Sequence, residues 1–549
     1  MRILVLLPLL AVSIVVMARS PQHVGKKLPE RRVRSAPMEI SVTESKADKR
    51  QSSRFLTERT SRYSVNGTGL PEVDFDIGES YAGLLPVSNT TDSPELYFWF
   101  FPSQNPAADK EITIWLNGGP GCSSLEGFFQ ENGPVIWQYG TFKPVPNPYS
   151  WVNLTNMIWV EQPVGTGFSQ GTPTATSEAD VAAQFLGFWR NVVDTFALQG
   201  FTVYITGESY AGYYVSYIAD AMFDADDREY YNLSSIMIYD PSLSSDAVQQ
   251  QIPAVPFVDY WGPLLSLNET FNADIHQRAD SCNYTSFLEE NLVFPPNGPL
   301  PTPPNIDGNV EGCDIWNDVY YAATEVNPCF DVYQVATTCP LLWDVMGFPG
   351  SFDYVPAEAE VYFNRSDVQA AINAPIQEWV ECTSRDVFVN GTDDSRPPAL
   401  SVLPRVIDRA ERTIIGHGLL DYILIYNGSL LAIQNMTFGG SQGFSSAPED
   451  DFIVPNLYPE LSLSSLAGSG VMGKYHTEKK LTLVSITIAG HMVPQYAPGA
   501  AYRQMEFLLG RIPSLGTAGS FTTQMETGGA YGPFKGSAAQ TTCHNNIVC

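Results

Sequence analysis

The stretch that decides the fold is Val203-Tyr-Ile-Thr-Gly-Glu-Ser-Tyr-Ala-Gly212. Its first residues are β-branched or aromatic, as in a strand, and a helical pattern follows it from Tyr213 to Phe223. Small residues at positions 207 and 211 let the chain turn sharply around Ser209, which holds the hydroxyl in a strained, exposed position. The start of a helix also favours developing negative charge. The stretch therefore predicts a nucleophile elbow, with Ser209 as the candidate nucleophile.

A serine nucleophile requires a histidine base and an acid that orients it. Six histidines are available: His23, His276, His417, His476, His491 and His544. The first lies in a basic N-terminal segment, the second in an insertion and the last in the tail, which leaves three in the expected core. His491 follows the β-rich run 481–488 and Asp421 follows the run 413–415, so both are expected on loops at strand ends. We predict His491 as base and Asp421 as acid. His417 is the alternative base, and a purely structural role is the alternative for each residue taken alone.

The surrounding pattern predicts an α/β-hydrolase fold. Between about residues 95 and 240, short β-rich runs alternate with helical ones, which is typical of a parallel sheet with crossover helices. The strand candidates are Leu96–Phe101, Ile112–Leu116, Met157–Val160 and Thr202–Thr206. Ser177 is expected to cap a helix, and a last helix is expected at about 500–509. Since the chain order Ser, Asp, His is also that of this fold, we predict a mostly parallel central sheet flanked by helices, with a Cys- and Pro-rich cap insertion.

The chain divides into six expected segments. Residues 1–18 carry one basic residue and then an apolar stretch, which is typical of a signal peptide, and residues 19–50 turn basic, as in a pro-segment cut after Arg50. A buried helix and a permanently attached tail are the alternatives for these two segments. The remaining segments are a first core part at 51–244, the cap insertion at 245–355, a second core part at 356–512 and a C-terminal tail at 513–549.

Composition limits the possible partners. The chain has 549 residues, 44% of them hydrophobic, which is enough for a sizeable core. It carries 30 Lys and Arg against 59 Asp and Glu, a net charge of −29. Such a charge argues against nucleic acid or an anionic membrane as a partner and suits acidic surroundings. No later apolar stretch of about 18 residues follows, so a soluble mature protein is expected.

Cysteines and glycosylation sequons point to the secretory pathway. An even number of cysteines behind a signal peptide predicts disulfides. The sequence has no C-x-x-C pair and its histidines are scattered, so a zinc site is not expected. The eight cysteines are Cys122, Cys282, Cys313, Cys329, Cys339, Cys382, Cys543 and Cys549. N-linked glycans are expected on several of ten sequons, and therefore at the surface: Asn66, Asn89, Asn153, Asn232, Asn268, Asn283, Asn364, Asn390, Asn427 and Asn435.

Five blocks of the sequence resemble the signature blocks of the serine carboxypeptidase family and occur in that family's order. They are Trp115-Leu-Asn-Gly-Gly-Pro-Gly-Cys-Ser-Ser124, Asn147-Pro-Tyr-Ser-Trp151, Glu161-Gln-Pro-Val-Gly-Thr-Gly-Phe-Ser169, Gly207-Glu-Ser-Tyr-Ala-Gly212 and Ala489-Gly-His-Met-Val-Pro494. The resemblance covers about residues 65–510, and the first and fourth blocks together are highly specific.

The resemblance implies roles for individual residues. It implies that Ser209 is the nucleophile, His491 the base and Asp421 the orienting acid, with no cofactor. The oxyanion hole would consist of the backbone N–H groups of Tyr210 and of one glycine, Gly118 or Gly119, with the second favoured. These positions agree with the physics of an elbow, because a glycine-rich strand end allows close backbone approach. The groups implied to bind the terminal carboxylate of a substrate are Trp115, Asn117, Glu131 and Glu208.

Two of these carboxylate-binding groups are themselves acids. Glutamates bind an anion only if at least one is protonated and donates a hydrogen bond, so clustered acids with raised pKa values predict a peptidase that is most active at acidic pH. Glu126 and Met492 fall at positions that the resemblance places near the pocket for the departing residue. Glu126 could attract a C-terminal Lys or Arg, and its alternative is a solvated surface group.

The resemblance also implies a disulfide between Cys122 and Cys382. The pairing of the four cysteines between 282 and 339 stays open among three connectivities, and Cys543 could pair locally with Cys549. The sequence departs from the family pattern beside two proposed triad members. The family often has Gly-Asp-x-Asp around its catalytic aspartate, whereas Gly418-Leu-Leu-Asp421 lacks the first of these acids. An x-Asp pair is common after His-x-Val-Pro, and here Gln495-Tyr496 stands in its place.

The sequence as a whole predicts a serine-type carboxypeptidase that releases C-terminal residues from peptides and proteins through an acyl-enzyme on Ser209. An acyltransferase of the same family and a catalytically inactive secreted binding protein are the alternatives. The expected partner is a peptide or protein with a free C-terminus, with neither nucleic acid nor a membrane. The expected location is the secretory pathway, with the extracellular space favoured over a vacuole or a cell wall.

Overall fold

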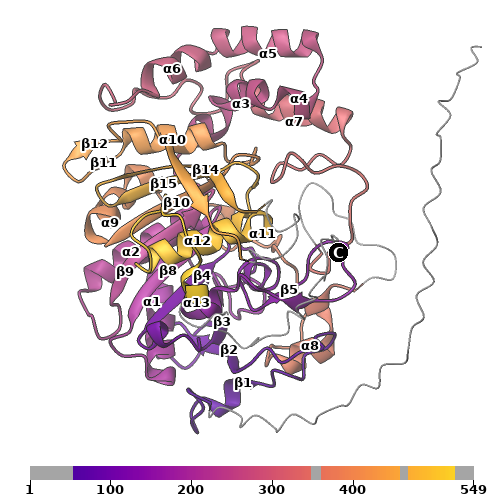
Figure 1. Ribbon diagram of the computed structural model, residues 1–549, viewed down its shortest axis with the longest axis vertical. Helices are drawn as coiled ribbons and strands as arrows, with labels where there is room; N and C mark the ends of the chain where they lie inside the picture. Colours follow the sequence, from indigo (N-terminus) through magenta and orange to yellow (C-terminus); the bar gives the residue numbers. More distant parts are fainter. Residues whose placement is uncertain (1–52, 348–359, 458–467, 526–549) are drawn as a thin grey trace, which may run out of the picture. The chain divides into compact units, whose positions relative to one another are not determined.

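The core of the protein is one large twisted sheet. A computed structural model describes residues 53–347, 360–457 and 468–525, and in these residues eleven strands pair in the order β1-β2-β3-β7-β4-β8-β9-β10-β15-β14-β13 (Figure 1). In this order the six neighbouring strands β7-β4-β8-β9-β10-β15 are parallel, and the strands on either side of them pair antiparallel. The bounds are β1 Ser64–Val65, β2 Ser80–Pro86, β3 Glu95–Phe101, β4 Glu111–Leu116, β7 Asn156–Glu161, β8 Thr202–Glu208, β9 Leu233–Tyr239, β10 Arg412–Gly418, β13 Asp450–Val454, β14 Gly470–Glu478 and β15 Leu481–Ile486. Two short hairpins lie outside the sheet, β5 Val135–Ile136 with β6 Val145–Pro146, and β11 Thr437–Phe438 with β12 Ser441–Gln442.

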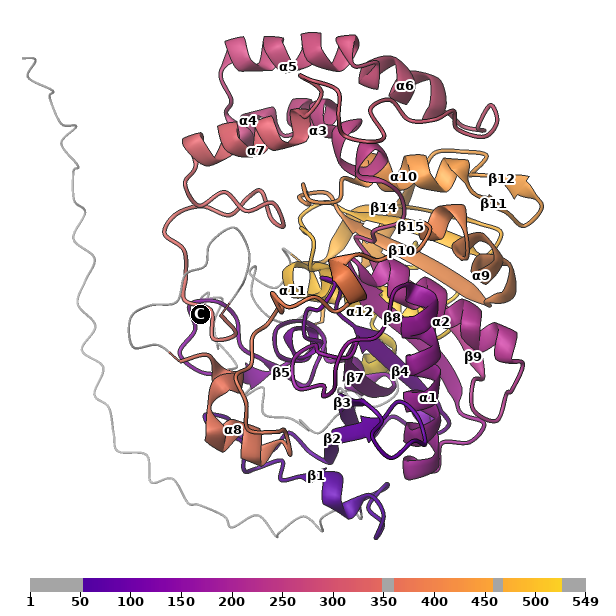
Figure 2. The same ribbon diagram turned by 180° about the vertical axis from the view of Figure 1, so that it is seen from behind.

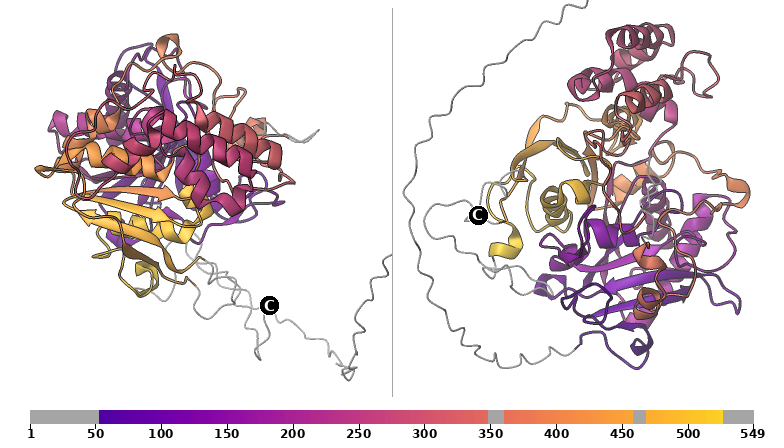
Figure 3. Two further views of the ribbon diagram at one scale, coloured as in Figure 1. Left: turned by 90° about the horizontal axis from the view of Figure 1, so that it is seen from above. Right: turned by 90° about the vertical axis from the view of Figure 1, so that its right-hand side faces the viewer.

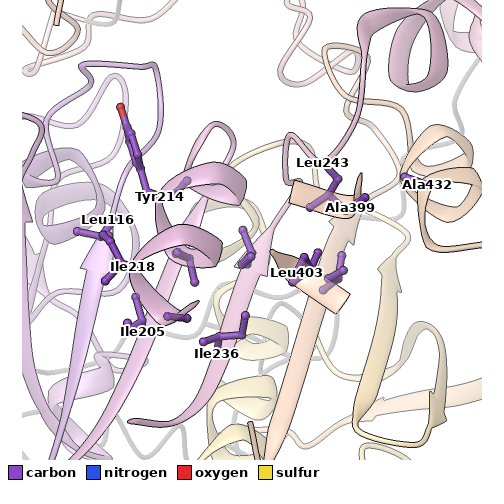
Figure 4. Close-up of a cluster of buried hydrophobic side chains, with 14 of the residues drawn as sticks. Leu116, Ile205, Tyr214, Ile218, Ile236, Leu243, Ala399, Leu403 and Ala432 are labelled. Atoms are coloured by element: carbon purple, nitrogen blue, oxygen red, sulfur yellow. The ribbon is translucent and has the colours of Figure 1, made fainter. Parts of the chain in front are cut away.

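Helices cover both faces of this sheet. Because side chains alternate along a strand, the buried strands contribute to two apolar clusters, one on each face. On one face lie α1 Glu178–Phe196 and α2 Ala211–Ala225, with α9 Leu403–Arg409 and α10 Tyr426–Asn435 in the same cluster (Figure 2). Ile205 and Ile236 of the strands contact this layer beneath Ile218 of α2 (Figure 4). The other face packs against α12 Pro498–Leu508. Short helices complete the core: α8 Ser366–Ala371, α11 Val493–Tyr496 and α13 Thr522–Met525.

The region expected as a cap is helical. It contains α3 Ala254–Tyr260, α4 Gly262–Leu265, α5 Glu269–Ser281, α6 Tyr284–Asn291 and α7 Ile315–Val326, which form a layer at one end of the sheet (Figure 3). Disulfides join Cys282 to Cys313 and Cys329 to Cys339. The indole N–H groups of Trp261 and Trp316 donate to the carbonyl oxygens of Leu419 and Tyr422, each at 2.8 Å. The helical region therefore supports the loop that follows β10.

Most expected elements are present. The six strand candidates correspond to β3, β4, β7, β8, β10 and β15, with ends shifted by at most three residues. The helix after Ser177 is present with Ser177 at its N-cap position, but the Ser177 side chain makes no hydrogen bond to the helix backbone. The Ser177 hydroxyl donates to Asp180 at 3.4 Å, and the Asp180 carboxylate instead accepts the backbone N–H of Thr176. Sequence patterns did not predict β2, β9, β13 or β14.

The expected modification sites and leader segments fall partly outside the described residues. Five of the ten sequon asparagines are exposed, Asn66, Asn89, Asn268, Asn283 and Asn390, and four are half-buried. Asn153 is buried, at 3% exposure, so it is not among the sequons that lie at the surface. The expected signal peptide, the pro-segment and the Cys543–Cys549 pair lie outside the described residues. No helix in the parts of the chain that the structure describes is long and apolar enough to cross a membrane.

Candidate active site

The candidate residues lie where parallel strands end. Register places Leu116 of β4 beside Gly207 of β8, and Gly418 of β10 beside Ile486 of β15. The carboxyl ends of parallel strands share one edge of a sheet, so the segments that follow these strands meet there. These segments carry Asn117, Ser209, Asp421 and His491.

Ser209 occupies a sharp turn between β8 and α2. Its φ of +62° is a left-handed conformation that non-glycine residues rarely adopt. Close packing requires small neighbours, because a Cβ on Gly207 would lie 2.4 Å from the Leu116 carbonyl oxygen, and one on Gly212 would lie 2.2 Å from that of Ser242. The backbone of Ser209 is tied to both sides, with its N–H donating to Tyr239 and its carbonyl accepting from Ser242, each at 2.9 Å. The turn is therefore fixed by its surroundings.

His491 and Asp421 form a buried pair. His491 Nδ1 lies 2.8 Å from Asp421 Oδ2, and Asp421 Oδ1 accepts the backbone N–H groups of Ile423 and Leu424 at 2.9 and 3.4 Å. The histidine backbone N–H donates to the carbonyl of Tyr333 at 2.8 Å. Burial opposes protonation of His491, but the charge of Asp421 and its hydrogen bond outweigh this, and the pKa of His491 is raised. His491 Nε2 is buried and has no hydrogen-bond partner among the described residues.

The other described histidines are occupied elsewhere. His417 Nδ1 lies 2.9 Å from Asp240 Oδ1, and its Nε2 lies 3.2 Å from the Ser429 hydroxyl, so neither ring nitrogen is available as a base. His476 is on the outer strand β14 and pairs with Glu478, and His276 pairs with Asp259 on the exposed side of α5.

Gly118 lies against the elbow. A Cβ on Gly118 would be 2.5 Å from the backbone nitrogen of Tyr210 and 2.8 Å from the Cβ of Ser209. Gly119 has a φ of +108°, which favours glycine. The Tyr210 side chain points to another neighbour, and its hydroxyl donates to Asp393 Oδ2 at 2.5 Å. The glycine-rich segment after β4 and the first turn of α2 are thus in direct contact.

Asn117 organises a buried polar cluster next to the elbow. Its amide Nδ2 donates to Glu208 Oε1 at 2.9 Å and to Glu126 Oε2 at 3.2 Å, and its Oδ1 accepts the indole N–H of Trp115 at 2.7 Å. Glu131 comes from the π-helical turn Gly127–Glu131, and carboxyl oxygens of Glu126, Glu131 and Glu208 lie within 4.8 Å of one another. The structure therefore brings five of the predicted residues together.

Several carboxyl oxygens of these glutamates lack a donor. No described donor is in hydrogen-bonding geometry to either oxygen of Glu131 or to Oε2 of Glu208. Burial, and then the neighbouring carboxyl groups, raise the pKa values of Glu131 and Glu208 well above the ordinary value, and burial with Asp344 raises the pKa of Glu126 to about 8. At acidic pH the cluster is therefore protonated, and it can donate hydrogen bonds to an anion.

Sequence reasoning missed two members of this acidic region. Glu381, 2% exposed, faces Glu126, and burial raises its pKa well above the ordinary value. Asp344 accepts a hydrogen bond from Gln130 Nε2 at 2.6 Å, and Gln130 Oε1 in turn accepts one from Gln495. The structure pairs Cys122 with Cys382, the residue after Glu381, which anchors this segment to the one after β4. Proximity of Glu381 to Cys382 was the only available signal for it.

Met492 follows His491 directly and is buried. Its carbonyl oxygen accepts the backbone N–H groups of Gln495 and Tyr496, so it begins the short helix α11. Met492 is therefore placed beside the histidine by the chain itself.

Comparisons with known proteins agree on one family. The family model described as serine carboxypeptidase matches residues 71–510. The chain is 57% identical over 508 residues to a probable serine carboxypeptidase of Arthroderma benhamiae, covering 90% of this chain and 95% of that protein. It is 45% identical to the serine-type carboxypeptidase F of Aspergillus niger, over 84% of this chain and 89% of that protein. Among solved structures, the prohormone-processing carboxypeptidase Kex1(delta)p of Saccharomyces cerevisiae is similar with a TM-score of 0.63 at 22% identity, covering 83% of this chain and 98% of that one. This last likeness agrees with the α/β-hydrolase fold.

Proposed function

The chain belongs to the serine carboxypeptidase family and is a serine-type carboxypeptidase acting on peptides, and from this we propose that Ser209, His491 and Asp421 carry out its chemistry. The Ser209 hydroxyl attacks the carbonyl carbon of the last peptide bond while His491 Nε2 takes its proton. Asp421 accepts a hydrogen bond from Nδ1–H of His491, which leaves Nε2 of the ring free to accept the Ser209 proton. His491 then returns the proton to the departing amino acid, and water hydrolyses the acyl-enzyme by the same route in reverse.

The oxyanion hole, in this proposal, consists of the backbone N–H groups of Tyr210 and Gly119, or of Gly118 in place of Gly119. The contact between Gly118 and the Tyr210 nitrogen supports it, because both donors must approach one oxygen atom. Removing one such donor typically costs about 3 to 4 kcal/mol of transition-state stabilisation.

Recognition of a free C-terminus is assigned to Trp115, Asn117, Glu131 and Glu208. The observation that carries this assignment is the cluster of Glu126, Glu131 and Glu208, whose buried carboxyl oxygens lie within 4.8 Å of one another. Both oxygens of Glu131 and Oε2 of Glu208 have no hydrogen-bond donor among the described residues. In its protonated form such a cluster donates hydrogen bonds to a carboxylate. In its ionised form it repels one.

The pH dependence follows from two opposite requirements. His491 must be neutral to act as a base, which limits activity on the acid side, and the glutamates must retain protons to bind the substrate, which limits it on the alkaline side. We therefore expect a bell-shaped profile with its maximum below neutrality. Equal efficiency at pH 8 and pH 5 on a blocked dipeptide would contradict this account.

The decisive experiment compares a blocked dipeptide with its C-terminal amide. The free acid should be hydrolysed far more efficiently, and this preference should persist to higher pH in the Glu131→Gln variant, which keeps a donor but no longer titrates. Labelling by an organophosphate, abolished by Ser209→Ala, identifies the nucleophile independently of substrate choice. Equal hydrolysis of acid and amide would remove the carboxylate-binding assignment and leave the triad untouched.

The side-chain pocket for the departing residue is assigned to Glu126 and Met492. Glu126 lies in the cluster through its hydrogen bond from Asn117, and Met492 adjoins His491. An ionised Glu126 would attract a C-terminal Lys or Arg.

We further propose processing and location. Residues 1–18 would be removed as a signal peptide and residues 19–50 as a pro-segment, with residues 245–355 forming the cap. The protein would enter the secretory pathway and carry N-linked glycans on exposed asparagines such as Asn66, Asn268 and Asn283. N-terminal sequencing of the purified enzyme tests the removal of residues 1–50. A decrease in its apparent mass on endoglycosidase treatment tests N-linked glycosylation.

A further inference from the structure

A second buried acid lies beside the proposed catalytic aspartate. Asp240 follows β9, His417 lies in β10, and both side chains are fully buried. Asp240 Oδ1 lies 2.9 Å from His417 Nδ1 and accepts the backbone N–H of Gly418, also at 2.9 Å. The proposed mechanism uses neither residue.

The partners of His417 define its tautomer. Its Nδ1 lies 3.3 Å from the carbonyl oxygen of Gly418, which can only accept, so Nδ1 carries the proton. Its Nε2 lies 3.2 Å from the hydroxyl of Ser429, which can donate to it while accepting from Gln249 Nε2 at 3.1 Å. His417 therefore accepts at Nε2 and donates from Nδ1 to Asp240. Burial lowers the pKa of His417 to about 4, so that the ring is neutral in this arrangement.

The other oxygen of Asp240 is the informative atom. Asp240 Oδ2 is buried and receives no hydrogen bond from any described donor. Carboxyl oxygens of Asp240 and Asp421 lie within 4.8 Å of each other. Two carboxylates at this separation in a desolvated site do not both ionise, since the second charge meets both burial and repulsion.

The hydrogen bonds decide which acid keeps the charge. Asp421 accepts from three donors, the ring of His491 and two backbone N–H groups. Asp240 accepts from two, both at Oδ1, and from no described donor at Oδ2. The negative charge therefore belongs on Asp421 and the proton on Asp240. Burial and then Asp421 raise the pKa of Asp240 well above its ordinary value, in agreement.

We propose that Asp240 is a positioning residue for Asp421: its Oδ2 carries the one proton that the two carboxyls share and donates it to Asp421, while His417 and Gly418 hold its Oδ1. This inference rests on the proposed role of Asp421. The arrangement orients Asp421 toward His491 without adding a second negative charge. An ionised Asp240 would raise the pKa of His491 further and make the base unusable at the acidic pH at which the glutamates bind substrate.

Other titratable groups surround the pair and define the background. Glu208 and Tyr239 are close enough to Asp240 to interact with it electrostatically, and Asp331 faces His491 and Asp421. Burial raises the pKa of Asp331 to about 6, so it is ionised at neutral pH. Asp331 is thus a matched buried acid that, unlike Asp240, acts on His491 through its charge.

The test compares Asp240→Asn with Asp240→Ala in the full-length enzyme, measuring kcat, KM and the pH profile of kcat/KM on a blocked dipeptide. An amide can make every hydrogen bond of a protonated Asp240, with Nδ2 donating to Asp421 and Oδ1 accepting from His417 and Gly418. We expect Asp240→Ala to lower kcat by roughly 10- to 100-fold with little change in KM, by analogy with the loss when a hydrogen-bonding partner of a metal ligand is removed. Asp240→Asn should recover most of that loss, with the acid limb of the profile unmoved.

Asp331→Asn is the control for charge sensitivity. It keeps the hydrogen bond to the Tyr333 backbone N–H but removes a charge, so it should move the acid limb to lower pH. An acid limb that moves to lower pH in Asp240→Asn would show that Asp240 is ionised and would overturn the proposal. So would an Asp240→Asn protein that does not fold, or an Asp240→Ala enzyme with wild-type kcat.

These outcomes are separable from failure of the proposed function. Organophosphate labelling of Ser209 should persist in both Asp240 variants, more slowly in Asp240→Ala. If the wild-type enzyme itself were not labelled at Ser209, the triad assignment would fail, and the Asp240 results would not bear on that failure.

Discussion

The two sides of Ser209 both bury carboxyl groups but surround them differently. On one side Asp421 accepts hydrogen bonds from His491 and from two backbone N–H groups. On the other side Glu131 and Glu208 retain oxygens that no described donor reaches, and their pKa values are raised well above normal. Donors, more than burial, therefore decide whether a carboxyl group in this site is an anion that orients a base or an acid that binds an anion.

The largest effect should come from the donor-rich side. Ser209→Ala and His491→Ala should each lower kcat by roughly a millionfold, as in other serine proteases. Asp421→Asn should cost about 10⁴-fold, because an amide presents a donor to His491 and favours the wrong tautomer. Steady-state kinetics measures each loss, with active-site titration for the variants that keep Ser209. A loss of less than about tenfold in Asp421→Asn would mean that Asp421 does not orient the base.

The donor-poor side should respond mainly to pH. Glu208→Gln retains a permanent donor, so at pH 5 its kcat/KM should be little below that of the wild type. Between pH 5 and pH 8 its kcat/KM should fall less than that of the wild type. The reason is that the wild-type donor disappears as pH rises through the raised pKa values of the cluster. Binding a charged group through a hydrogen bond contributes about 1.5 to 3 kcal/mol, or roughly 10- to 100-fold in kcat/KM.

Asn117→Ala is the matched control for that experiment, since it removes a donor that does not titrate. Because Asn117 also donates to Glu208 and Glu126, its loss should raise their pKa values, so Asn117→Ala should lower kcat/KM at pH 5 and move the alkaline limb to higher pH, whereas Glu208→Gln should flatten that limb. A Glu208→Gln enzyme with the wild-type alkaline limb would show that Glu208 does not control substrate binding by its protonation.

The same contrast predicts how stability depends on pH. A carboxyl group whose pKa is higher in the folded than in the unfolded protein favours the folded state at low pH, and this advantage is lost as pH rises through the folded pKa. Burial raises the pKa of Glu161 to about 7 and, with Asp344, that of Glu126 to about 8. The melting temperature should therefore fall between pH 5 and pH 8.

A substitution at Glu161 tests the pH dependence of stability at a residue outside the proposed catalytic triad. Its carboxyl group is buried and accepts hydrogen bonds from the Phe168 N–H at 2.5 Å and the Trp379 indole at 3.3 Å. Its raised pKa corresponds to a loss on the order of 3 kcal/mol between pH 4.5 and pH 8. Glu161→Gln should flatten the fall in melting temperature, measured by calorimetry, and an unchanged slope would contradict the assignment.

Local sequence was informative where local structure carries the function. The turn around Ser209 needs small residues at fixed offsets, and the β-rich runs before Asp421 and His491 place both on strand ends, so these features are visible in the chain itself. Asn117, Glu131 and Glu208 were identified through the family resemblance, and no periodicity would have found them. Asp240 and Asp344 left no usable signal, and Glu381 had only its position beside Cys382. Folding of distant segments brings Asp240 to Asp421, and it brings Asp344 and Glu381 to Glu126.

His417 illustrates the remaining limit. From sequence it was the alternative base, since it lies four residues before Asp421. The structure instead places its ring between Asp240 and Ser429, with both nitrogens in contact. Sequence distance indicates which residues share a strand end, but it does not indicate the direction of a side chain.

The smallest expected effect concerns Glu126, which should change from a neutral acid to an anion between pH 5 and pH 8. Burial and Asp344 raise its pKa to about 8, so at pH 5 it is neutral and offers little attraction to a cationic side chain. The preference for a C-terminal Lys over Leu should therefore increase by about tenfold or less as pH rises from 5 to 8, and Glu126→Gln should abolish that increase. Ratios of kcat/KM for two blocked dipeptides that differ only in the last residue measure this, and they cancel the common loss of carboxylate binding. A Glu126→Gln enzyme that discriminates Lys from Leu as the wild type does at every pH would remove Glu126 from the pocket.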